Sequence, residues 1–402
     1  MSQQAVTTTG TELSAGDTWG APTCPPQVLA LRERVAGFVR EQVMPHEREL
    51  DSGGAPAREL LARLRHRARA EGLWGLPLPV ELGGAGLSLT EYAHVAEAEG
   101  ASDHGPGVLG STALLDVTTL TGHAEPAVRD LYLSRVASGR LTMCNAMTEP
   151  DAPGSEPCLT ATRAVQEPDG SWTVHGRKWF VTGAGDADLA AVLARTSGAP
   201  PSTTGLSLLL VPTSTPGFRV IRELPILGVG GQWEITLDAV TVPPGHLLGE
   251  PGRGLRVVAE RVRLGRLLRC LRWLGQAERA FTLMRERARS RPTASGRLAD
   301  LQLVQALVFD ALLAIRTTRP LVFEAVALVE AGLDARVETG LAKVATARML
   351  QQVTDAAIQV HGAAGLGPGT PLPALFRTGR MARLLDGPDE LHVSAVARRI
   401  LG

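Results

Sequence analysis

The chain has 402 residues, which is long for a single domain and leads us to expect two or three domains. Its 41 Lys and Arg residues balance its 41 Asp and Glu residues, so charge gives no support for binding to nucleic acid or to an anionic membrane. The four cysteines form no CxxC pair and the nine histidines no HExxH pair, which argues against a disulfide framework and against a metal site.

Residues 1–25 are expected to be a disordered tail, because they are rich in Thr, Ser, Gly, Gln and Pro. They lack the basic start and the apolar core of a signal peptide. No apolar run in the chain is long enough to cross a bilayer as a helix. We therefore expect a protein of the reducing cytoplasm with no part in the membrane.

Residues 26–140 are predicted to form an all-helical N-terminal domain, because apolar residues recur at intervals of three and four. A Gly- and Pro-rich loop at 75–88 divides this helical segment. Ser88 has Glu91 three residues after it, which predicts an N-cap with a capping box at the start of the next helix.

Beyond Leu141 the apolar period changes to two and turn residues become frequent, which indicates strands. The strand candidates that follow this pattern are 189–193, 206–211, 218–221 and 234–242. Residues 141–248 are therefore expected to be a small antiparallel β domain.

Two clusters of small and hydroxyl residues stand out in this β segment. The first, residues 146–155, offers a hydroxyl, backbone donors and a loop, a combination that suits a polar planar ligand. The second follows a predicted hairpin, in which alternation from Trp172 reaches a two-residue turn at His175-Gly176 and residues 178–182 return antiparallel. The residues alone leave two interpretations open, a ligand cradle and an ordinary hairpin with a Pro- and Gly-rich loop.

The helical period returns after Gly254 and continues to the end of the chain. Helices are predicted at 254–289, 298–332, 335–360 and 388–400, with a Gly-rich turn after the third of them. Long helices with short connections favour a four-helix bundle over residues 249–402. The predicted fold is therefore α+β and mostly α, with an N-terminal helical domain, a middle antiparallel β domain and a C-terminal four-helix bundle.

Six motifs in this order give the chain a resemblance to the acyl-CoA dehydrogenase flavoprotein family, from about residue 26 to the end. They are GLPLPVELGGAGLS at 75–88, AMTEPDAPGS at 146–155, GRKWFVTGAG at 176–185, ERARSRPTASGRLADLQLVQ at 286–305, QVHGAAGLG at 359–367 and LLDGPDELH at 384–392. The DGPDE form is most similar to the branch with the larger animal acyl-CoA dehydrogenases. No Rossmann GxGxxG fingerprint is present, so FAD would be held by loops and helix ends.

The resemblance implies that the β domain holds the flavin of FAD. It assigns Met147 and Thr148 to the pyrimidine side of the flavin, and Ser155 to a position near both the flavin and the carrier arm of the substrate. Phe180 matches the aromatic residue that packs on the flavin, and Thr182 matches the hydroxyl at its N5 edge. The alternative for each residue is a hairpin core position or a hydroxyl satisfied within the protein.

The resemblance also implies contacts to the rest of FAD across a subunit interface in a homodimer or homotetramer. Arg291 and Thr293 match the pair that holds the pyrophosphate, a role that suits a bidentate guanidinium. The remaining dinucleotide contacts are Gln302, Gln359, Val360, Gly362 and Ala363. The chain departs from the family pattern at Ala294, Ser295 and Thr378, which puts the local packing and the interface geometry in doubt.

Asp386 matches the catalytic base of the family, which removes the α proton of the substrate while flavin N5 accepts the β hydride. Gly387 would contact the substrate, and Pro388 and Glu390 would line the FAD. Arg266 matches a family arginine beside this loop and is the expected orienting partner. Two alternatives stay open: Asp386 could only cap the last helix, and Arg266 could be one more arginine on the helix surface.

The expected function is FAD-dependent α,β-dehydrogenation of an acyl thioester carried by CoA or by an acyl carrier protein. Electrons would pass to an electron-transferring flavoprotein. The alternative on the same scaffold is a flavin-dependent oxidase or monooxygenase, which reoxidation by oxygen would distinguish. A helical assembly protein that has lost its cofactor is a third reading, and a colourless protein that takes up no FAD would favour it.

Overall fold

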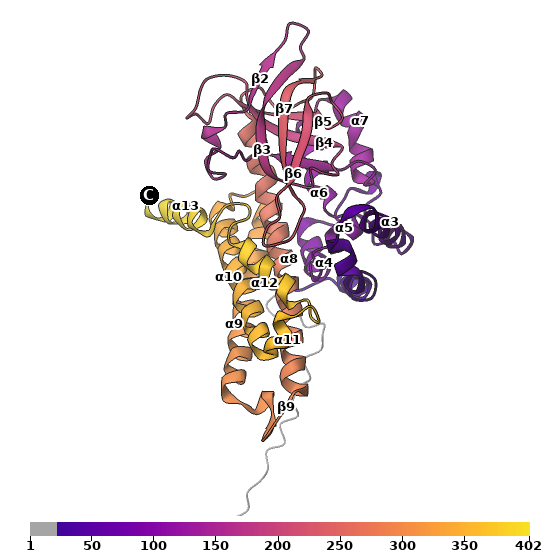
Figure 1. Ribbon diagram of the computed structural model, residues 1–402, viewed down its shortest axis with the longest axis vertical. Coiled ribbons are helices and arrows are strands. Elements are labelled where there is room, and N and C mark those ends of the chain that lie inside the picture. Colours follow the sequence, from indigo (N-terminus) through magenta and orange to yellow (C-terminus); the bar gives the residue numbers. More distant parts are fainter. Residues whose placement is uncertain (1–21) are drawn as a thin grey trace, which may run out of the picture.

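The computed structural model describes residues 22–402, so most of the expected tail at 1–25 lies outside the described residues. Figure 1 shows a β domain above a long helical bundle, with the N-terminal helices along one side. Within the described range, no helix is both long enough and apolar enough to cross a membrane. The mostly helical fold with a β middle domain confirms the predicted fold class.

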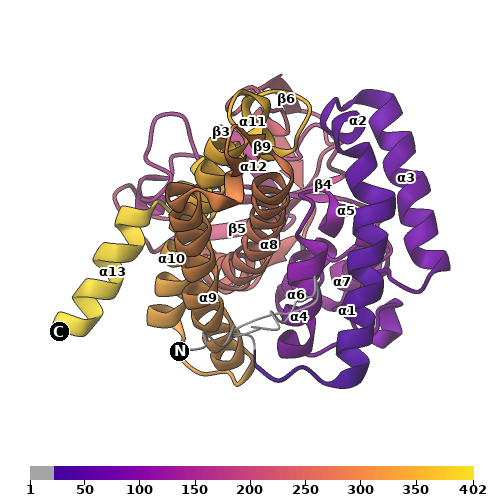
Figure 2. The ribbon, with the colours of Figure 1, turned by 90° about the horizontal axis from the view of Figure 1, so that it is seen from below.

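The N-terminal helices pack against the bundle and do not stand apart from it. Figure 2 shows α8 with the N-terminal helices on one side and α9 and α10 on the other. Ser88 caps α4 with the capping box that the sequence predicts. The helices of this part are α1 (Pro26–Phe38), α2 (Glu47–Asp51), α3 (Gly54–Ala70), α4 (Leu89–Glu99), α5 (Gly105–Leu109), α6 (Ala113–His123) and α7 (Pro126–Ala137).

The middle domain is one sheet in the order β6-β7-β3-β2-β4-β5-β8, with β1 paired to β4. The sheet is largely antiparallel, but β1 and β2 both pair with β4 in parallel, which the sequence did not predict. The strands are β1 (Met143–Ala146), β2 (Arg163–Gln166), β3 (Trp172–Thr182), β4 (Leu189–Arg195), β5 (Leu206–Pro212), β6 (Phe218–Glu223), β7 (Gln232–Val242) and β8 (Leu247–Leu248).

The predicted turn at His175-Gly176 is wrong, because β3 runs through both residues as one strand. The hairpin instead joins β2 to β3 and turns at Asp169-Gly170. Gly176 serves a different purpose: a Cβ there would lie 2.3 Å from the hydroxyl oxygen of Thr162, so only glycine permits this close approach. The pairing of β3 with β7 shifts register between Val174 and Gly176, so the strand is irregular at this point without reversing direction.

The bundle is built around α10, which contacts α8, α9 and α12. Its fourth helix is α12 and not the C-terminal helix, which projects from the bundle in Figure 1. Gly379 lets α12 pack closely, since a Cβ there would lie 3.0 Å from the Cα of Gln351 on α10. The elements are α8 (Gly254–Ser290), β9 (Pro292–Thr293), β10 (Gly296–Arg297), α9 (Gln302–Glu330), α10 (Arg336–His361), α11 (Ala363–Leu366), α12 (Leu372–Ala382) and α13 (Asp389–Leu401).

A buried ion triad joins the N-terminal helices to the bundle. Arg319 of α9 is 1% exposed, and its Nη2 lies 2.6 Å from Glu97 of α4 and 2.5 Å from Glu278 of α8. Burial alone would lower the pKa of Arg319, but the two carboxylates raise it above its ordinary value. The triad thus links α4 of the N-terminal part to α8 and α9 of the bundle.

Candidate active site

The first hydroxyl cluster and β3 meet as the sequence predicts, although not through a tight turn. The Thr148 hydroxyl donates to the carbonyl of Trp179 at 2.6 Å, and the Trp179 amide donates back to the carbonyl of Thr148 at 3.1 Å. Met147 and Thr148 are therefore fixed beside the strand that carries Phe180 and Thr182. Ser155, by contrast, is exposed and has no hydrogen bond within residues 22–402.

A buried lysine, Lys178, contacts the segment of Met147 and Thr148. Lys178 is fully buried, and its Nζ donates to the carbonyl of Met147 at 3.0 Å and to Glu149 at 2.8 Å. Burial lowers the pKa of Lys178 to about 8, although the negative charge of Glu149 acts to raise it. Glu149 also accepts hydrogen bonds from the amides of Ala161 and Thr162 and from the Thr162 hydroxyl. Sequence reasoning missed this pair, although a lysine inside an alternating strand is a signal for it.

Phe180 and Thr182 present side chains at the surface of the β domain. Phe180 has a φ of 48° and is 43% exposed, an unusual combination for a large aromatic residue. Its ring lies 4.7 Å from that of Trp179. The Thr182 hydroxyl donates to the side chain of Gln232 at 3.0 Å. The backbone thus leaves an aromatic ring exposed, with a hydroxyl two residues further along the strand.

Asp386 lies in the loop between α12 and α13 with a φ of 56°, a left-handed conformation that is rare outside glycine. Nε of Arg266 donates to its carbonyl oxygen at 2.9 Å, and Nε2 of His392 lies 3.2 Å from the same oxygen. Its carboxylate contacts Arg269 instead, with Nε 2.6 Å from Oδ2. The expected orienting arginine therefore holds the main chain of Asp386, and Arg269 contacts the carboxylate.

Asp386 does not cap the last helix, so that alternative is wrong. The N-cap position of α13 is Pro388, which makes no side-chain hydrogen bond. Gly387 and Pro388 are half-buried within the loop, and Glu390 is exposed on the first turn of α13.

A second buried carboxylate closes the loop around Asp386. Asp389 is 2% exposed and lies 2.8 Å from Nε of Arg383 and 3.3 Å from Nζ of Lys343. Burial acts to raise the pKa of Asp389, but the hydrogen bond from Arg383 and the charge of Lys343 outweigh it and lower that pKa. The amide of Asp389 also donates to the carbonyl of Arg383 at 3.0 Å. These contacts join Arg383, before Asp386, to Asp389, after it, and so fix both ends of the loop.

His392 makes the stability of this region sensitive to acid. Burial, with the charges of Arg266 and Lys343, lowers the pKa of His392 from 6.5 to about 4. Between these values the unfolded chain binds more protons than the folded chain, so stability falls as the pH falls. We expect lowering the pH from 7.5 to 5 to cost about 2 kcal/mol of unfolding free energy through His392.

The measurement is urea unfolding at the two pH values for the wild type and for His392→Gln, which keeps a donor near the Asp386 carbonyl. The difference between the two pH values should shrink in His392→Gln and persist in His46→Asn, since the side chain of His46 is 43% exposed. An equal pH dependence in all three proteins would contradict the assignment.

The other predicted FAD residues lie at the far end of the molecule. Arg291 and Thr293 follow α8 at the foot of Figure 1, whereas β3 and the α13 start lie in its upper half. With 37 residues, α8 is roughly 55 Å long at 1.5 Å per residue. The structure does not bring these residues together with Thr148 in one chain. The same holds for the other predicted dinucleotide contacts, which are Gln302, Gln359, Val360, Gly362 and Ala363.

The residues at both ends suit a flavin dinucleotide. At the upper end, an exposed aromatic ring and a hydroxyl stand beside backbone groups of Met147 and Thr148. At the lower end, the Thr293 hydroxyl is buried without a partner in the described structure, and the Arg291 side chain is exposed. Ala294 and Ser295 form the turn between β9 and β10, so the departure from the family pattern leaves that hairpin intact.

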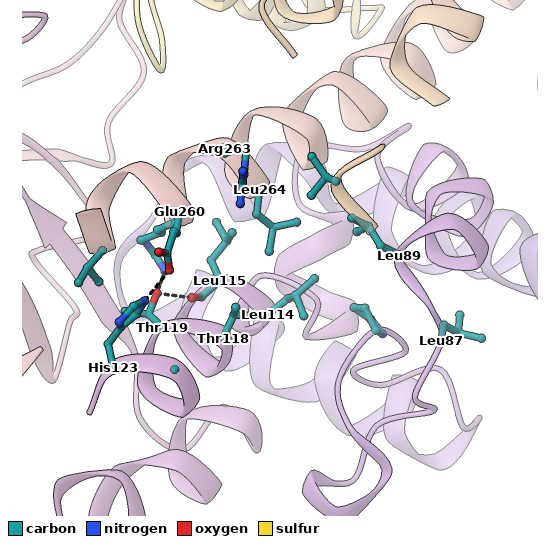
Figure 3. Close-up of a pocket in the computed structure, with 15 residues that line it drawn as sticks. Leu87, Leu89, Leu114, Leu115, Thr118, Thr119, His123, Glu260, Arg263 and Leu264 are labelled. Atoms are coloured by element: carbon teal, nitrogen blue, oxygen red, sulfur yellow. Dashed lines mark hydrogen bonds and ion pairs between the residues drawn. The ribbon is translucent and has the colours of Figure 1, made fainter. Parts of the chain in front are cut away.

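A cavity of about 370 Å³ lies between α4, α6 and α8. Figure 3 shows Leu115 and Leu264 facing into it, with His123 and Glu260 at one end and Leu89 at the other. A Cβ at Gly265 would lie 3.5 Å from Leu115, so α6 touches α8 immediately before Arg266. None of the predicted site residues lines this cavity. The full lining is Pro77, Leu87, Leu89, Leu114, Leu115, Thr118, Thr119, Gly122, His123, Val257, Glu260, Arg261, Arg263, Leu264 and Val329.

The chain is built of an N-terminal helical part, a middle β domain and a C-terminal helical bundle, in this order. Three family models match in succession: the acyl-CoA dehydrogenase N-terminal domain at 25–140, the middle domain at 144–240 and the C-terminal domain at 252–401. The chain therefore belongs to the acyl-CoA dehydrogenase family.

Individual relatives agree with this assignment. The chain is 33% identical to mouse acyl-CoA dehydrogenase family member 10, over 93% of this chain and 37% of that protein. It thus spans half or less of the length of the animal relatives it matches. FadE2 of Mycobacterium tuberculosis, named as an acyl-CoA dehydrogenase, is 32% identical over 92% of this chain and 95% of its own length. A solved structure from Mycobacterium abscessus, assigned to the acyl-CoA dehydrogenases, has a TM-score of 0.87 at 33% identity and covers 94% of this chain and 99% of that one.

Proposed function

We propose that the protein binds FAD and dehydrogenates an acyl thioester at its α and β carbons. The observation that carries the proposal is the state of Asp386. One oxygen of its carboxylate is buried without a hydrogen-bond donor, although Arg269 stands beside it as a counter-charge. A carboxylate with an unfilled oxygen and a fixed backbone is suited to accept a proton from carbon.

Each part of the chain then has one task in the reaction. Asp386 takes the α proton, and its position is set by the contacts of Arg266 and His392 with its carbonyl. Met147, Thr148, Phe180 and Thr182 would hold the flavin, which supplies the acceptor for the β hydride. Ser155 and Gly387 would contact the thioester arm, and Pro388 and Glu390 would flank the cofactor.

The complete site would need two copies of the chain. Arg291 and Thr293 lie roughly 37 Å along α8 from Arg266, at 1.5 Å for each of the intervening residues. That separation supports a homo-oligomer, a dimer or a tetramer, in which one subunit holds the pyrophosphate of the FAD bound to the other. We also propose a cytoplasmic location. CoA or an acyl carrier protein would carry the acyl group, and an electron-transferring flavoprotein would accept the electrons.

The test is anaerobic bleaching of the flavin by a panel of acyl-CoA and acyl-carrier-protein thioesters, on protein reconstituted with FAD. Bleaching by at least one thioester is expected. The panel also shows whether CoA or an acyl carrier protein carries the acyl group. Failure of every thioester, or purified protein that takes up no FAD, would refute the proposal. Rapid reoxidation of the reduced flavin by oxygen would favour the oxidase or monooxygenase alternative.

We further propose that the cavity between α4, α6 and α8 receives the far end of the acyl chain. Its walls are mostly apolar, and Leu115 links it to the segment of α8 that contacts Asp386. Leu264→Trp should therefore lower kcat/KM for a C16 thioester at least tenfold and change the value for a C4 thioester about threefold or less. Leu131→Trp is the matched control, because Leu131 is exposed on α7. Equal losses for both chain lengths would rule out this use of the cavity.

A further inference from the structure

The cations around Asp386 divide into those that contact its main chain and one that contacts its carboxylate. The hydrogen bonds of Arg266 and His392 with Asp386 go to its carbonyl oxygen, and Arg266 is also near enough for its charge to interact with that of the carboxylate. Lys343 and Arg383 are directed at Asp389. Among the described residues, Arg269 alone forms an ion pair with Asp386.

The position of Arg269 follows from the helix that carries it. Arg266 and Arg269 are three residues apart on α8, so they project from neighbouring positions of one face. The loop of Asp386 lies across this face, with its carbonyl toward Arg266 and its carboxylate toward Arg269. The Arg269 side chain is 33% exposed and that of Asp386 is 26% exposed, so water screens this pair only in part.

Arg269 contacts the carboxylate of Asp386 directly. Nε of Arg269 lies 2.6 Å from Oδ2 of Asp386, although the alignment of the two groups is not that of a hydrogen bond. A guanidinium at this distance attracts the carboxylate and so restricts the directions in which the side chain can turn.

We propose that Arg269 is a positioning residue that holds the carboxylate of Asp386 in place, whereas the hydrogen bonds of Arg266 and His392 hold the main chain of the loop. The inference rests on the proposed role of Asp386 as the base. Removing the guanidinium should leave the carboxylate without its ion-pair partner, so that it can turn away from the position in which the pair holds it. The other charges near the loop, Lys343, Asp389 and Arg383, remain in place in an Arg269 variant.

The experiment compares Arg269→Gln, Arg269→Lys and Arg256→Gln with the wild type. Arg256 lies on the same helix and forms a solvent-exposed ion pair with Glu260, so its replacement controls for the loss of an arginine from α8. One readout is the rate of flavin reduction by the best thioester at pH 7, separated into the limiting rate and the thioester concentration at half-saturation. A second readout, which needs no cofactor, is the chemical shift of the Asp386 carboxyl ¹³C resonance at pH 7, assigned by its absence in Asp386→Asn.

In Arg269→Gln, we expect flavin reduction at pH 7 to slow about tenfold with little change in half-saturation, and the carboxyl resonance of Asp386 to move from its wild-type position. Arg269→Lys should recover most of both effects, and Arg256→Gln should match the wild type. An unchanged rate and resonance in Arg269→Gln, or equal changes in Arg256→Gln, would overturn the inference. Full activity in Asp386→Asn would instead refute the proposed base, so the two failures are distinguishable.

Discussion

Asp386→Asn is expected to reduce the rate of flavin reduction by an acyl thioester roughly 10²- to 10⁴-fold. Asparagine keeps the size of the side chain but has no oxygen basic enough to take the α proton. The loop should keep its shape, because Arg266 and His392 contact the main chain and not the carboxylate. The measurement is stopped-flow absorbance of the flavin under anaerobic conditions, with the FAD content determined separately.

Two controls make this result specific. Asp130→Asn removes an exposed carboxylate from α7 and should leave the rate unchanged. Asp386→Glu restores a base on a side chain one methylene longer, and it should recover part of the lost rate. A normal rate in Asp386→Asn would remove the base from the mechanism, and loss of FAD from that variant would show that the residue acts in binding.

Arg319→Met is expected to destabilise the protein by about 3–5 kcal/mol. The substitution leaves Glu97, which is 2% exposed, as a buried charge without its counter-ion, and it removes the partner of Glu278. The larger part of the loss is expected from Glu97, because the side chain of Glu278 is 36% exposed and water can partly replace Arg319 there. Urea unfolding near pH 7 measures the change in the free energy of unfolding.

Arg336→Met is the matched control for this experiment. Arg336 pairs with Asp334, but both side chains are more than half exposed, so its loss should leave the free energy of unfolding almost unchanged. A second comparison replaces the charges together, as Glu97→Leu with Glu278→Leu and Arg319→Met, which should be far less damaging than the single change. Equal effects of Arg319→Met and Arg336→Met would show that the triad contributes no more than a surface pair.

Helices with long regular patterns were predicted closely from the sequence, and helices with irregular starts were missed. The pattern at 254–289 matches α8 within one residue at its C-terminal end, because 37 residues of regular repeat leave little ambiguity. No element was predicted where α12 lies, because its segment begins with Pro371-Leu372-Pro373 after a glycine-rich stretch, which gives no helical pattern at its start. Proline at the first turn is compatible with a helix, and the packing of Gly379 on α10 completes it.

The turn in β3 was predicted wrongly for a related reason. His175-Gly176 has the composition of a two-residue turn, but Asp169-Gly170 is the stronger signal and lies between the strands that actually pair. The function of Gly176 depends on Thr162, which lies on the neighbouring chain segment and cannot be read from local sequence.

The candidate site shows the same division between local pattern and tertiary contact. The resemblance to the family implied that Arg266 lies beside the Asp386 loop, and Nε of Arg266 donates to the carbonyl of Asp386. No motif indicates which atom of Asp386 an arginine contacts, so Arg269 was not predicted, although its three-residue spacing from Arg266 puts it on the same helix face. Lys178 and Glu149 were missed because only the folded sheet brings the buried lysine to the carbonyl of Met147.

The triad of Glu97, Arg319 and Glu278 also bears on how the chain loses its structure. The helices on either side of it share one apolar core, which runs from Val28 in α1 to Ala382 in α12. A segment that shares its core with another cannot open alone without exposing the apolar surface of both. The N-terminal helices and the bundle therefore form one cooperative unit, in which amide protons deep in α4 exchange with solvent only when those of α8 and α9 do.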